Sequence, residues 1–338
     1  MKSNLARLLT GCLGVLMVIG FIAACGGTDR SADGGIGGTG ISIGAITRTG
    51  VGSIDVNKVQ FDIASANIII DDSPGNESDL ALGQVVRVEG EFDDDGVNGT
   101  ALSIEIDSLL EGPITEPVDT TNRIITVVGQ TVFYDSSTVF EASGGVSITP
   151  DQLVEDNVVE VYGFPDSRLQ IKATRVEKKS NTYTPGSDVI QVKGLVANLD
   201  TTQMIFDITA LENHYSMATT FDNGSASDLT NDRFVEVKGT NDVSSDGFLT
   251  ANKIEFEDPF GGNDGDLLEV EGNISWVSST TSTDFVVNGT FHVDASGALF
   301  EGGTAADIAV DVEVEIEGQV EDRLGELILV AQEVEFED

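Results

Sequence analysis

Histidine, cysteine and tryptophan are nearly absent from this chain of 338 residues, which has two, two and one of them. The two histidines, His214 and His292, are 78 positions apart, and no G-x-S-x-G motif accompanies them. A Ser-His-Asp hydrolase needs a histidine beside an activated serine. We therefore expect no hydrolase of that type, and we interpret both histidines as polar loop or strand residues.

The two cysteines both lie near the N-terminus, at Cys12 and Cys25. Lys2 and Arg7 precede an apolar run over residues 8–24, the order that is typical of an export signal. The run ends in "IAAC", which resembles a bacterial lipobox, so we expect a signal peptide over residues 1–24 and lipid on Cys25. An ordinary signal peptide is the alternative. The processed chain would have no free thiol, which excludes cysteine nucleophiles and zinc–thiolate sites.

The segment after Cys25 is rich in glycine and small polar residues, "GGTDRSADGGIGGTG". Such a segment cannot bury a core, so residues 25–40 are predicted to be a lipidated flexible tether. No aspartate follows the cysteine, where it would resemble an inner-membrane retention signal. For a Gram-negative source we expect the outer membrane, on its periplasmic face or at the cell surface.

Basic residues are scarce, 17 against 58 acidic residues, and the formal net charge is −41. Such a charge repels phosphate backbones and makes nucleic acid a poor partner. The expected partners are the membrane, through the lipid, and an unidentified envelope or extracellular ligand.

No long stretch shows a helical period, but one strand pattern occurs four times: "VVRVEG", "VVEVYG", "FVEVKG" and "VEIEG", ending at Gly90, Gly163, Gly239 and Gly318. Apolar and polar residues alternate before each glycine, which indicates a strand with one buried and one wet face. Ten residues before each glycine stands an aliphatic residue, preceded by Asp or Gln, for which we expect a single helical turn. The aliphatic residues are Leu80, Leu153, Leu229 and Ile308.

Each copy also opens with a glycine-containing strand, at Gly44, Gly112, Gly194 and Gly272, and closes with an alternating strand. About five short strands in some 70 residues favour a small antiparallel Greek-key barrel of the OB type. The predicted fold is all-β, with four tandem OB-like barrels over residues 41–113, 114–186, 187–262 and 263–338. Glycine inside a strand is expected where the sheet bends to close.

The first copy resembles the bacterial repeat family called domain of unknown function 5666. The resemblance is carried by "GIGGTGISIGAITRTGVGSIDVNKVQFD", "DLALGQVVRVEGEF" and "GTALSIEID" and covers residues 36–114. In later copies the "GSIDVNKVQFD" segment is lost and only the later strand pattern persists. The family implies tandem OB-like barrels in an exported lipoprotein, and it supplies no catalytic residues.

Two acidic turns are candidates for calcium. "DDDGVNG" (93–99) offers Asp93, Asp95 and Asn98, and "GGNDGD" (261–266) offers Asp264 and Asp266. Clustered oxygen ligands on glycine-rich turns suit calcium. The first turn lacks EF-hand spacing and the second has no neighbouring copy to stack on, so a hairpin turn and a linker are the alternatives.

Repetition without a catalytic constellation predicts a non-enzymatic, lipid-anchored binding or spacer module of the cell envelope, without a cofactor. Two alternatives stay open. One is a calcium-responsive adhesion or interaction protein. The other is a carboxylate-based hydrolase with its site between repeats, since 58 acidic residues offer many pairs.

Overall fold

The computed structural model describes residues 38–93, 96–106 and 108–337. The prediction of an all-β protein is confirmed: these residues contain 26 strands, one four-residue helix, α1 (Val243–Asp246), and two 3₁₀ turns, η1 (Glu77–Asp79) and η2 (Pro150–Gln152). No helix in the described part of the chain is long and apolar enough to cross a membrane. The signal peptide, the tether and Cys25 lie outside the described residues.

The first copy closes five strand positions into a ring. β1 pairs with β2, β2 with β3, β3 with β7 in parallel, β7 with β6, and β6 again with β1. The short strand β4 adds to β7, also in parallel, and β5 pairs with β4. The strands are β1 (Gly38–Gly50), β2 (Ser53–Val56), β3 (Val59–Asp62), β4 (Asn67–Ile70), β5 (Ser73–Pro74), β6 (Val85–Phe92) and β7 (Asn98–Ile106).

The same cyclic order recurs in the other three copies, with a single bridge from Ile114 to Val127 closing the second. The second copy comprises β8 (Leu110–Pro113), β9 (Ile124–Val127), β10 (Gln130–Phe133), β11 (Val139–Ala142), β12 (Val146–Ser147), β13 (Val158–Pro165) and β14 (Ile171–Ser180). The third comprises β15 (Ile190–Asp200), β16 (Ile205–Ile208), β17 (Leu211–His214), β18 (Thr220–Asp222), β19 (Phe234–Gly239) and β20 (Leu249–Phe256). The fourth comprises β21 (Leu267–Val277), β22 (Asp284–Val287), β23 (Phe291–Asp294), β24 (Leu299–Glu301), β25 (Glu313–Arg323) and β26 (Glu326–Phe336). Because β8 pairs with β13, the second copy begins at β8, before the expected boundary at residue 113.

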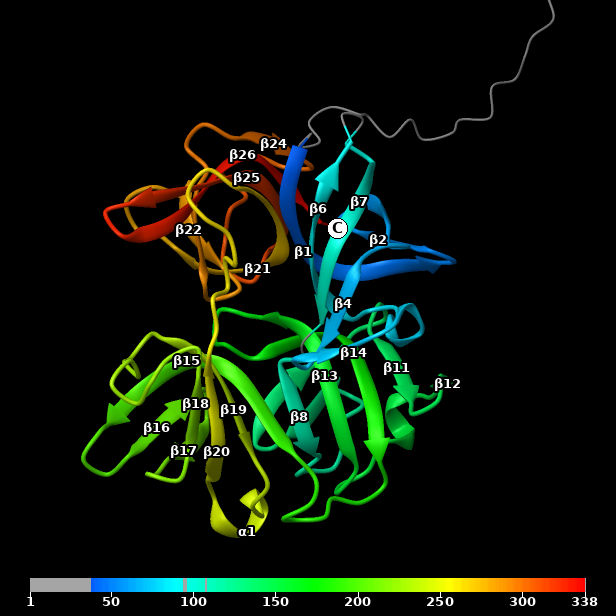
Figure 1. The fold of residues 1–338 in the computed structure, drawn as a ribbon, viewed down its shortest axis with the longest axis vertical. Helices are drawn as coiled ribbons and strands as arrows, with labels where there is room; N and C mark the ends of the chain where they lie inside the picture. Colours follow the sequence, from blue (N-terminus) through cyan, green and yellow to red (C-terminus); the bar gives the residue numbers. More distant parts are fainter. Residues whose placement is uncertain (1–37, 94–95, 107, 338) are drawn as a thin grey trace, which may run out of the picture. The chain divides into compact units, whose positions relative to one another are not determined.

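The copies are joined in a nested order, first with fourth and second with third. β1 of the first copy pairs in parallel with β21 of the fourth, and β8 of the second pairs antiparallel with β15 of the third. Each pair of copies therefore forms one 13-stranded sheet. Figure 1 shows the first of these junctions as the blue strand β1 alongside the yellow-orange β21.

The two repeated glycines have different structural roles. Gly90, like its three counterparts, lies at a β-bulge, and a Cβ there would be 2.5 Å from the carbonyl oxygen of Thr100 on the neighbouring strand. Such bulges bend a strand, as we expected where the sheet closes. The first-strand glycine instead makes room for a turn: a Cβ on Gly272 would lie 2.0 Å from Asn288 Oδ1.

The turn before each repeated strand is built around a capping side chain. In the fourth copy Asp307 Oδ2 accepts the backbone N–H of Thr304 at 2.9 Å, and Ile308 follows it into the core. Asp79, Gln152 and Asp228 make the same bond in the other copies. A capping carboxylate or amide fixes the direction in which the chain enters the strand. The turn is 3₁₀ in the first two copies and a hydrogen-bonded turn in the last two.

The expectation of a fully wet second face on the repeated strands is wrong at several positions. Glu160, Tyr162 and Glu236 are at most 3% exposed, because neighbouring copies cover that face. Tyr162 of the second copy joins the hydrophobic cluster of the first, and the second and third copies share one cluster. Polar groups are thus enclosed between copies, where they need partners.

Candidate functional site

A pair of facing side chains recurs on the repeated strand and the last strand of every copy. The position three residues before the bulge glycine lies opposite a glutamate of the last strand. The pairs are Arg87–Glu105, Glu160–Glu177, Glu236–Glu255 and Glu315–Glu335. Three copies therefore place two carboxylates opposite each other, which is destabilising unless a cation lies between them.

The second and third copies supply that cation from their own lysines. Lys179 Nζ lies 2.8 Å from Glu160 and 3.8 Å from Glu177. In the third copy Lys238 Nζ is 2.7 Å from Glu236, and Lys253 pairs with Glu255.

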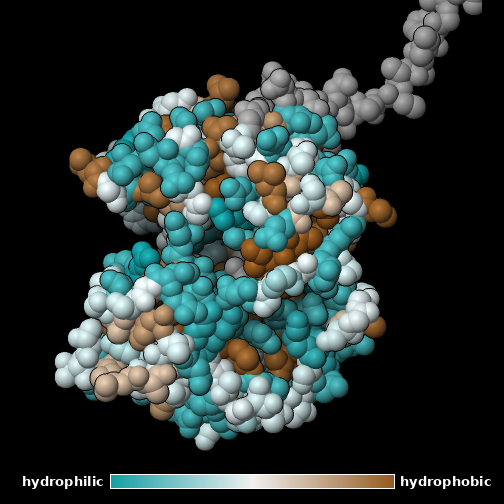
Figure 2. All heavy atoms as spheres, viewed as in Figure 1, coloured by the Kyte–Doolittle hydropathy of each residue, from teal (hydrophilic) through white to brown (hydrophobic). Residues whose placement is uncertain are grey.

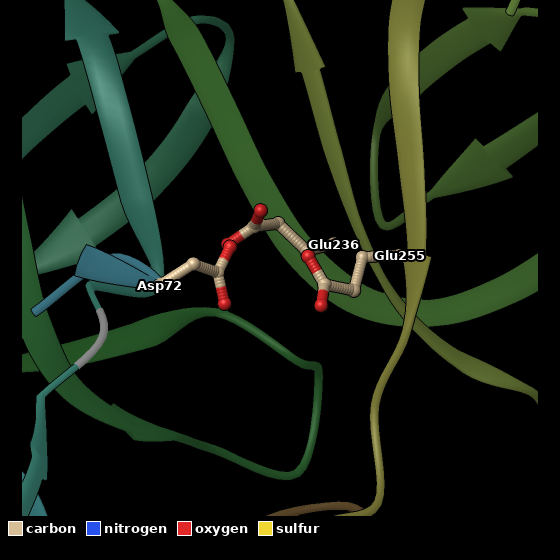
Figure 3. A group of neighbouring side chains, drawn as sticks. All are labelled: Asp72, Glu236 and Glu255. Carbon is tan, nitrogen blue, oxygen red and sulfur yellow. The ribbon is translucent and has the colours of Figure 1, made fainter. Parts of the chain in front are cut away.

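Asp72 of the first copy completes a carboxylate group in the third. The Asp72 group, defined as Asp72, Glu236 and Glu255, has one oxygen from each residue within 4.8 Å of the others, and Figure 3 shows the three side chains turned toward one another. Lys253 Nζ lies 3.0 Å from Asp72 Oδ2, so lysines already compensate this group.

The fourth copy takes its cation from the first. Lys58, in the turn between β2 and β3, is ion-paired with Glu335, with Glu337 at 3.0 Å and with Glu315 at 3.6 Å. We call Glu315, Glu335 and Glu337 the Lys58 group, since their oxygens also lie within 4.8 Å of one another. These ion pairs stabilise the junction between the first and fourth copies.

A further group of carboxylates lies beside it and shares Glu315, the residue that is ion-paired with Lys58 at 3.6 Å. Glu269, Glu315 and Glu317, here the Glu269 group, place one oxygen each within 4.8 Å of one another. Glu269 is 2% exposed, and its Oε2 accepts a hydrogen bond from Ser42 Oγ at 2.7 Å. Among the described residues no Lys or Arg forms an ion pair with Glu269 or Glu317.

The pKa values of these carboxyls are raised. Burial and the Glu315 carboxylate raise the pKa of Glu269 well above its usual range. Burial, opposed by Lys58, raises the pKa of Glu315 to about 8. Burial and the neighbouring carboxylates of Glu333 and Glu335 raise the pKa of Glu317 to about 7. A cluster of this kind favours protons or metal cations as counter-charges.

None of the groups of three or more close carboxylates in the described part of the chain contains Asp93, Asp264 or Asp266, and the calcium sites stay a prediction. Asp266 Oδ2 accepts the backbone N–H of Asn263 at 2.7 Å, which is the capping bond of the turn before β21. Asp264 Oδ1 accepts the N–H of Asp322 at 3.0 Å. The first bond lies within the turn before β21, and the second connects this turn to β25.

In the other predicted calcium turn, the backbones of Asp93 and Asn98 pair across the β6–β7 hairpin, the Asp93 N–H donating to Asn98 O at 2.9 Å. Asp95 lies outside the described residues. The described part of this turn is therefore a hairpin.

The histidines are held by carboxylates. His292 places Nε2 2.7 Å from Asp284 and Nδ1 3.0 Å from Glu326. Burial opposes the charge on His292, but these two hydrogen bonds outweigh it and raise the pKa. His214 Nε2 lies 2.6 Å from Glu212, and its ring stacks on Phe248. Both histidines lie on strands, and the ring of each lies beside acidic side chains.

The sequence contained a signal for the buried carboxylates that the pattern analysis missed. Glu160, Glu236 and Glu315 occupy one repeat position, and lysine follows nearby only in the second and third copies. A glutamate that recurs at one position of a strand with few compensating lysines indicates an inter-copy or ligand contact. The alternation of apolar and polar residues, taken alone, predicts that these glutamates face solvent.

An all-β chain of four identically connected copies belongs to the tandem-repeat class of proteins. The chain is a member of the family described as "Domain of unknown function (DUF5666)", whose model matches residues 43–105, 111–177, 193–255 and 271–335. The resemblance read from the first copy is thus confirmed and extends to all four.

Two further comparisons add little to the family. No curated protein matches the chain. Among solved structures, the one titled "drosophila Unr CSD456" is similar at 13% identity with a TM-score of 0.16, covering 68% of this chain and 97% of that chain.

Proposed function

We propose that the chain is a lipid-anchored, non-enzymatic protein of the cell envelope, in which four OB-type barrels form a spacer or binding module. The observation that carries the proposal is the nested strand pairing of β1 with β21 and of β8 with β15. Backbone pairing joins the copies into two sheets, and contacts such as Lys172–Glu313 and Arg175–Leu82 connect the two sheets, in contrast to barrels on flexible linkers. A body held at several interfaces keeps a bound partner at a fixed place.

The strand order supports barrels of the OB type. In each copy the cyclic order is first, second, third, fifth and fourth strand, with only the third and fifth strands parallel. A closed five-stranded Greek-key barrel has this connectivity. Its side faces are then available to neighbouring copies.

The exposed surface favours a polar rather than an apolar contact with a partner. Figure 2 shows polar residues over most of one face, with hydrophobic residues in small separate groups. The exposed large hydrophobic residues, such as Val51, Met217 and Leu324, lie near hairpin or turn positions. Scattered residues of this kind do not form an apolar binding patch.

The anchor is tested by replacing Cys25 with serine. We expect Cys25→Ser to abolish fatty-acid labelling and to release the chain from membranes, since two or more acyl chains are needed for stable anchoring. Cys12→Ser is the matched control and should leave both unchanged. A Cys25→Ser chain that stays membrane-bound after a high-salt wash would refute the anchor.

A carboxylate hydrolase is the second candidate, and one observation favours it. A cavity of about 530 Å³ between copies is lined by Asp71, Glu111, Lys179 and Lys238, among others. Burial and the nearby Glu160 carboxylate raise the pKa of Glu111 to about 7, a value suited to a general acid. Turnover of a polysaccharide or ester that is lost in Glu111→Gln would establish this function in place of the first.

A further inference from the structure

A cavity of about 590 Å³ lies between the first and second copies. Its wall is formed by the segment from η1 to β6 in the first copy and by parts of β11, β13 and β14 in the second. The volume lies within the range of sites for small molecules, about 300–1,000 Å³. The cavity has only Asp71 and Lys179 in common with the one considered above for a hydrolase, so the two are separate polar spaces.

Arg175 places an unused hydrogen-bond donor in this wall. The residue is 1% exposed, and its terminal nitrogens donate to Leu82 O at 3.2 Å, to Glu141 at 3.0 Å and to Glu177 at 3.1 Å. The buried Nε of Arg175, by contrast, has no hydrogen-bond partner. A buried donor without a partner is costly, and an acceptor oxygen of a ligand satisfies it.

The direction of this donor follows from the shape of the guanidinium group. In the planar group the Nε–H points to the same side as Nη2, the nitrogen that donates to Glu141 and Glu177. Both glutamates line the cavity, as Arg175 itself does. The unpartnered N–H and two carboxylates are therefore presented together at one side of the wall.

The charges of the wall favour a neutral ligand. Five acidic and two basic residues line the cavity, and this acidic excess disfavours an anion. Arg175 is ion-paired with Glu141 and Glu177. Lys179 is ion-paired with Glu160 at 2.8 Å and with Glu177 at 3.8 Å. These fixed cations already supply positive charge to three of the carboxylates, so hydrogen bonding, rather than charge, is what the wall offers to a ligand.

We infer that this cavity binds a neutral sugar. A sugar hydroxyl donates to a carboxylate such as that of Glu141 or Glu177 and at the same time accepts from the Arg175 Nε–H, so one group satisfies both sides of the wall. Gly144, in the turn between β11 and β12, is exposed and places no side chain across this edge of the cavity. The inference names a ligand class for the binding role proposed above and rests on that role.

Saturation-transfer NMR of the full chain with glucose, galactose, mannose and N-acetylglucosamine tests the inference, and titration calorimetry measures the affinity. We expect saturable binding of at least one of these neutral sugars. Glucuronic acid and glucosamine carry one charge each on a similar ring, and they should bind at least about tenfold more weakly. Maltose and diacetylchitobiose distinguish the source of the ligand: tighter binding of a disaccharide indicates a polysaccharide, and weaker binding indicates a free sugar.

Two variants test the cavity itself. Ser78 is exposed and lines the cavity, so Ser78→Phe should fill part of it and abolish binding without loss of core packing. Arg175→Lys keeps a positive charge beside the two carboxylates but lacks the Nε–H, and it should weaken binding about tenfold. The matched controls are Ser296→Phe, in an exposed turn of the fourth copy, and Arg323→Lys, at an exposed arginine. Both should bind sugar as the wild-type chain does.

The inference is overturned if none of the neutral sugars binds saturably, if the charged sugars bind equally well, or if Ser78→Phe leaves binding unchanged. Circular dichroism and the melting temperature verify that each variant is folded. The result is separate from that of the anchor, because Cys25→Ser should leave sugar binding unchanged and Ser78→Phe should leave the chain on the membrane.

Discussion

Asn57 fills the space into which a side chain on Gly44 would project: a Cβ on Gly44 would lie 1.9 Å from Asn57 Oδ1. The same relationship holds between Gly272 and Asn288 in the fourth copy, at 2.0 Å. Asn57 has φ of 47° and Asn288 has φ of 53°, values that asparagine tolerates better than most residues. The first-strand glycine and the turn asparagine therefore act as one packing unit.

Because the two residues pack as one unit, we predict that Asn57→Gly partly restores the stability lost in Gly44→Ala. Gly44→Ala should destabilise the chain by about 1–3 kcal/mol through overpacking. Asn57→Gly removes the contacted oxygen, so the double variant should lose less than the sum of the two single losses. Urea unfolding measures all three. Gly297→Ala, at a glycine whose Cβ would meet nothing within 4 Å, is the control and should be nearly neutral.

We predict a large loss of folding stability when the buried cation of Arg175 is removed. It is 1% exposed and donates to Leu82 O at 3.2 Å, to Glu141 at 3.0 Å and to Glu177 at 3.1 Å. Arg175→Met leaves these acceptors without their donor, and we expect a loss of about 3–5 kcal/mol in the free energy of unfolding.

The control for Arg175 is Arg323→Met, which removes an exposed guanidinium with two carboxylate partners. It should cost far less than Arg175→Met, because exposed ion pairs contribute little to stability. Equal losses in the two variants would contradict the role assigned to burial.

We predict that replacing Lys58 causes a salt-dependent loss of stability at the junction between the first and fourth copies. Lys58→Gln removes the ammonium from among Glu315, Glu335 and Glu337, so these carboxylates repel one another. We expect a loss on the order of 1 kcal/mol that shrinks as NaCl screens the repulsion. Urea midpoints at low and high salt measure it. Lys178→Gln, at a side chain without an ion pair in the described residues, should show little loss at either salt concentration.

Because the pKa of Glu111 is raised, we predict that its contribution to the free energy of unfolding falls as pH rises toward 7. Its pKa is raised from 4.5 to about 7 in the folded chain, so between these values the folded state binds more protons than the unfolded state. The stabilising contribution of the protonated form is complete below about pH 4.5 and is lost as pH rises through about 7. Glu111→Gln should therefore raise the melting temperature at pH 8 and change it little at pH 4.5.

The size of the Glu111 effect is at most about 3 kcal/mol. Glu116→Gln, which removes one exposed carboxylate from the chain between β8 and β9, is the control for the loss of a single negative charge. An equal gain for Glu111→Gln at both pH values would show that Glu111 is charged in the folded chain throughout this range.

The strand content and the repetition could be predicted because both depend on local pattern. Alternation around Gly90 predicts a strand in any β context, and Leu80 with its capping Asp79 recurs at a fixed spacing. The enclosure of Glu236 could not be predicted, because it depends on which copy covers that face. Asp72 contacts it from more than 160 residues away, through the pairing of copies rather than through the sequence of either strand.

The buried carboxylates illustrate the same limit. Asp264 and Asp266 lie two positions apart, and each accepts a backbone N–H, from Asp322 of β25 and from Asn263 of the turn respectively. Glu269 and Glu317 are 48 positions apart and lie opposite each other only because β21 pairs with β25. Ser42 reaches Glu269 across 227 positions.

In the nested order, the junction between the second and third copies lies, along the chain, inside the junction between the first and fourth copies. The middle junction, β8 with β15, joins neighbours in the chain, but the outer junction waits until the last copy has been made. Contacts this distant slow folding, so the edge of β1 that pairs with β21 stays unpaired until the last copy has been made. A chain that ended before β21 would therefore leave this edge of β1 without its parallel partner.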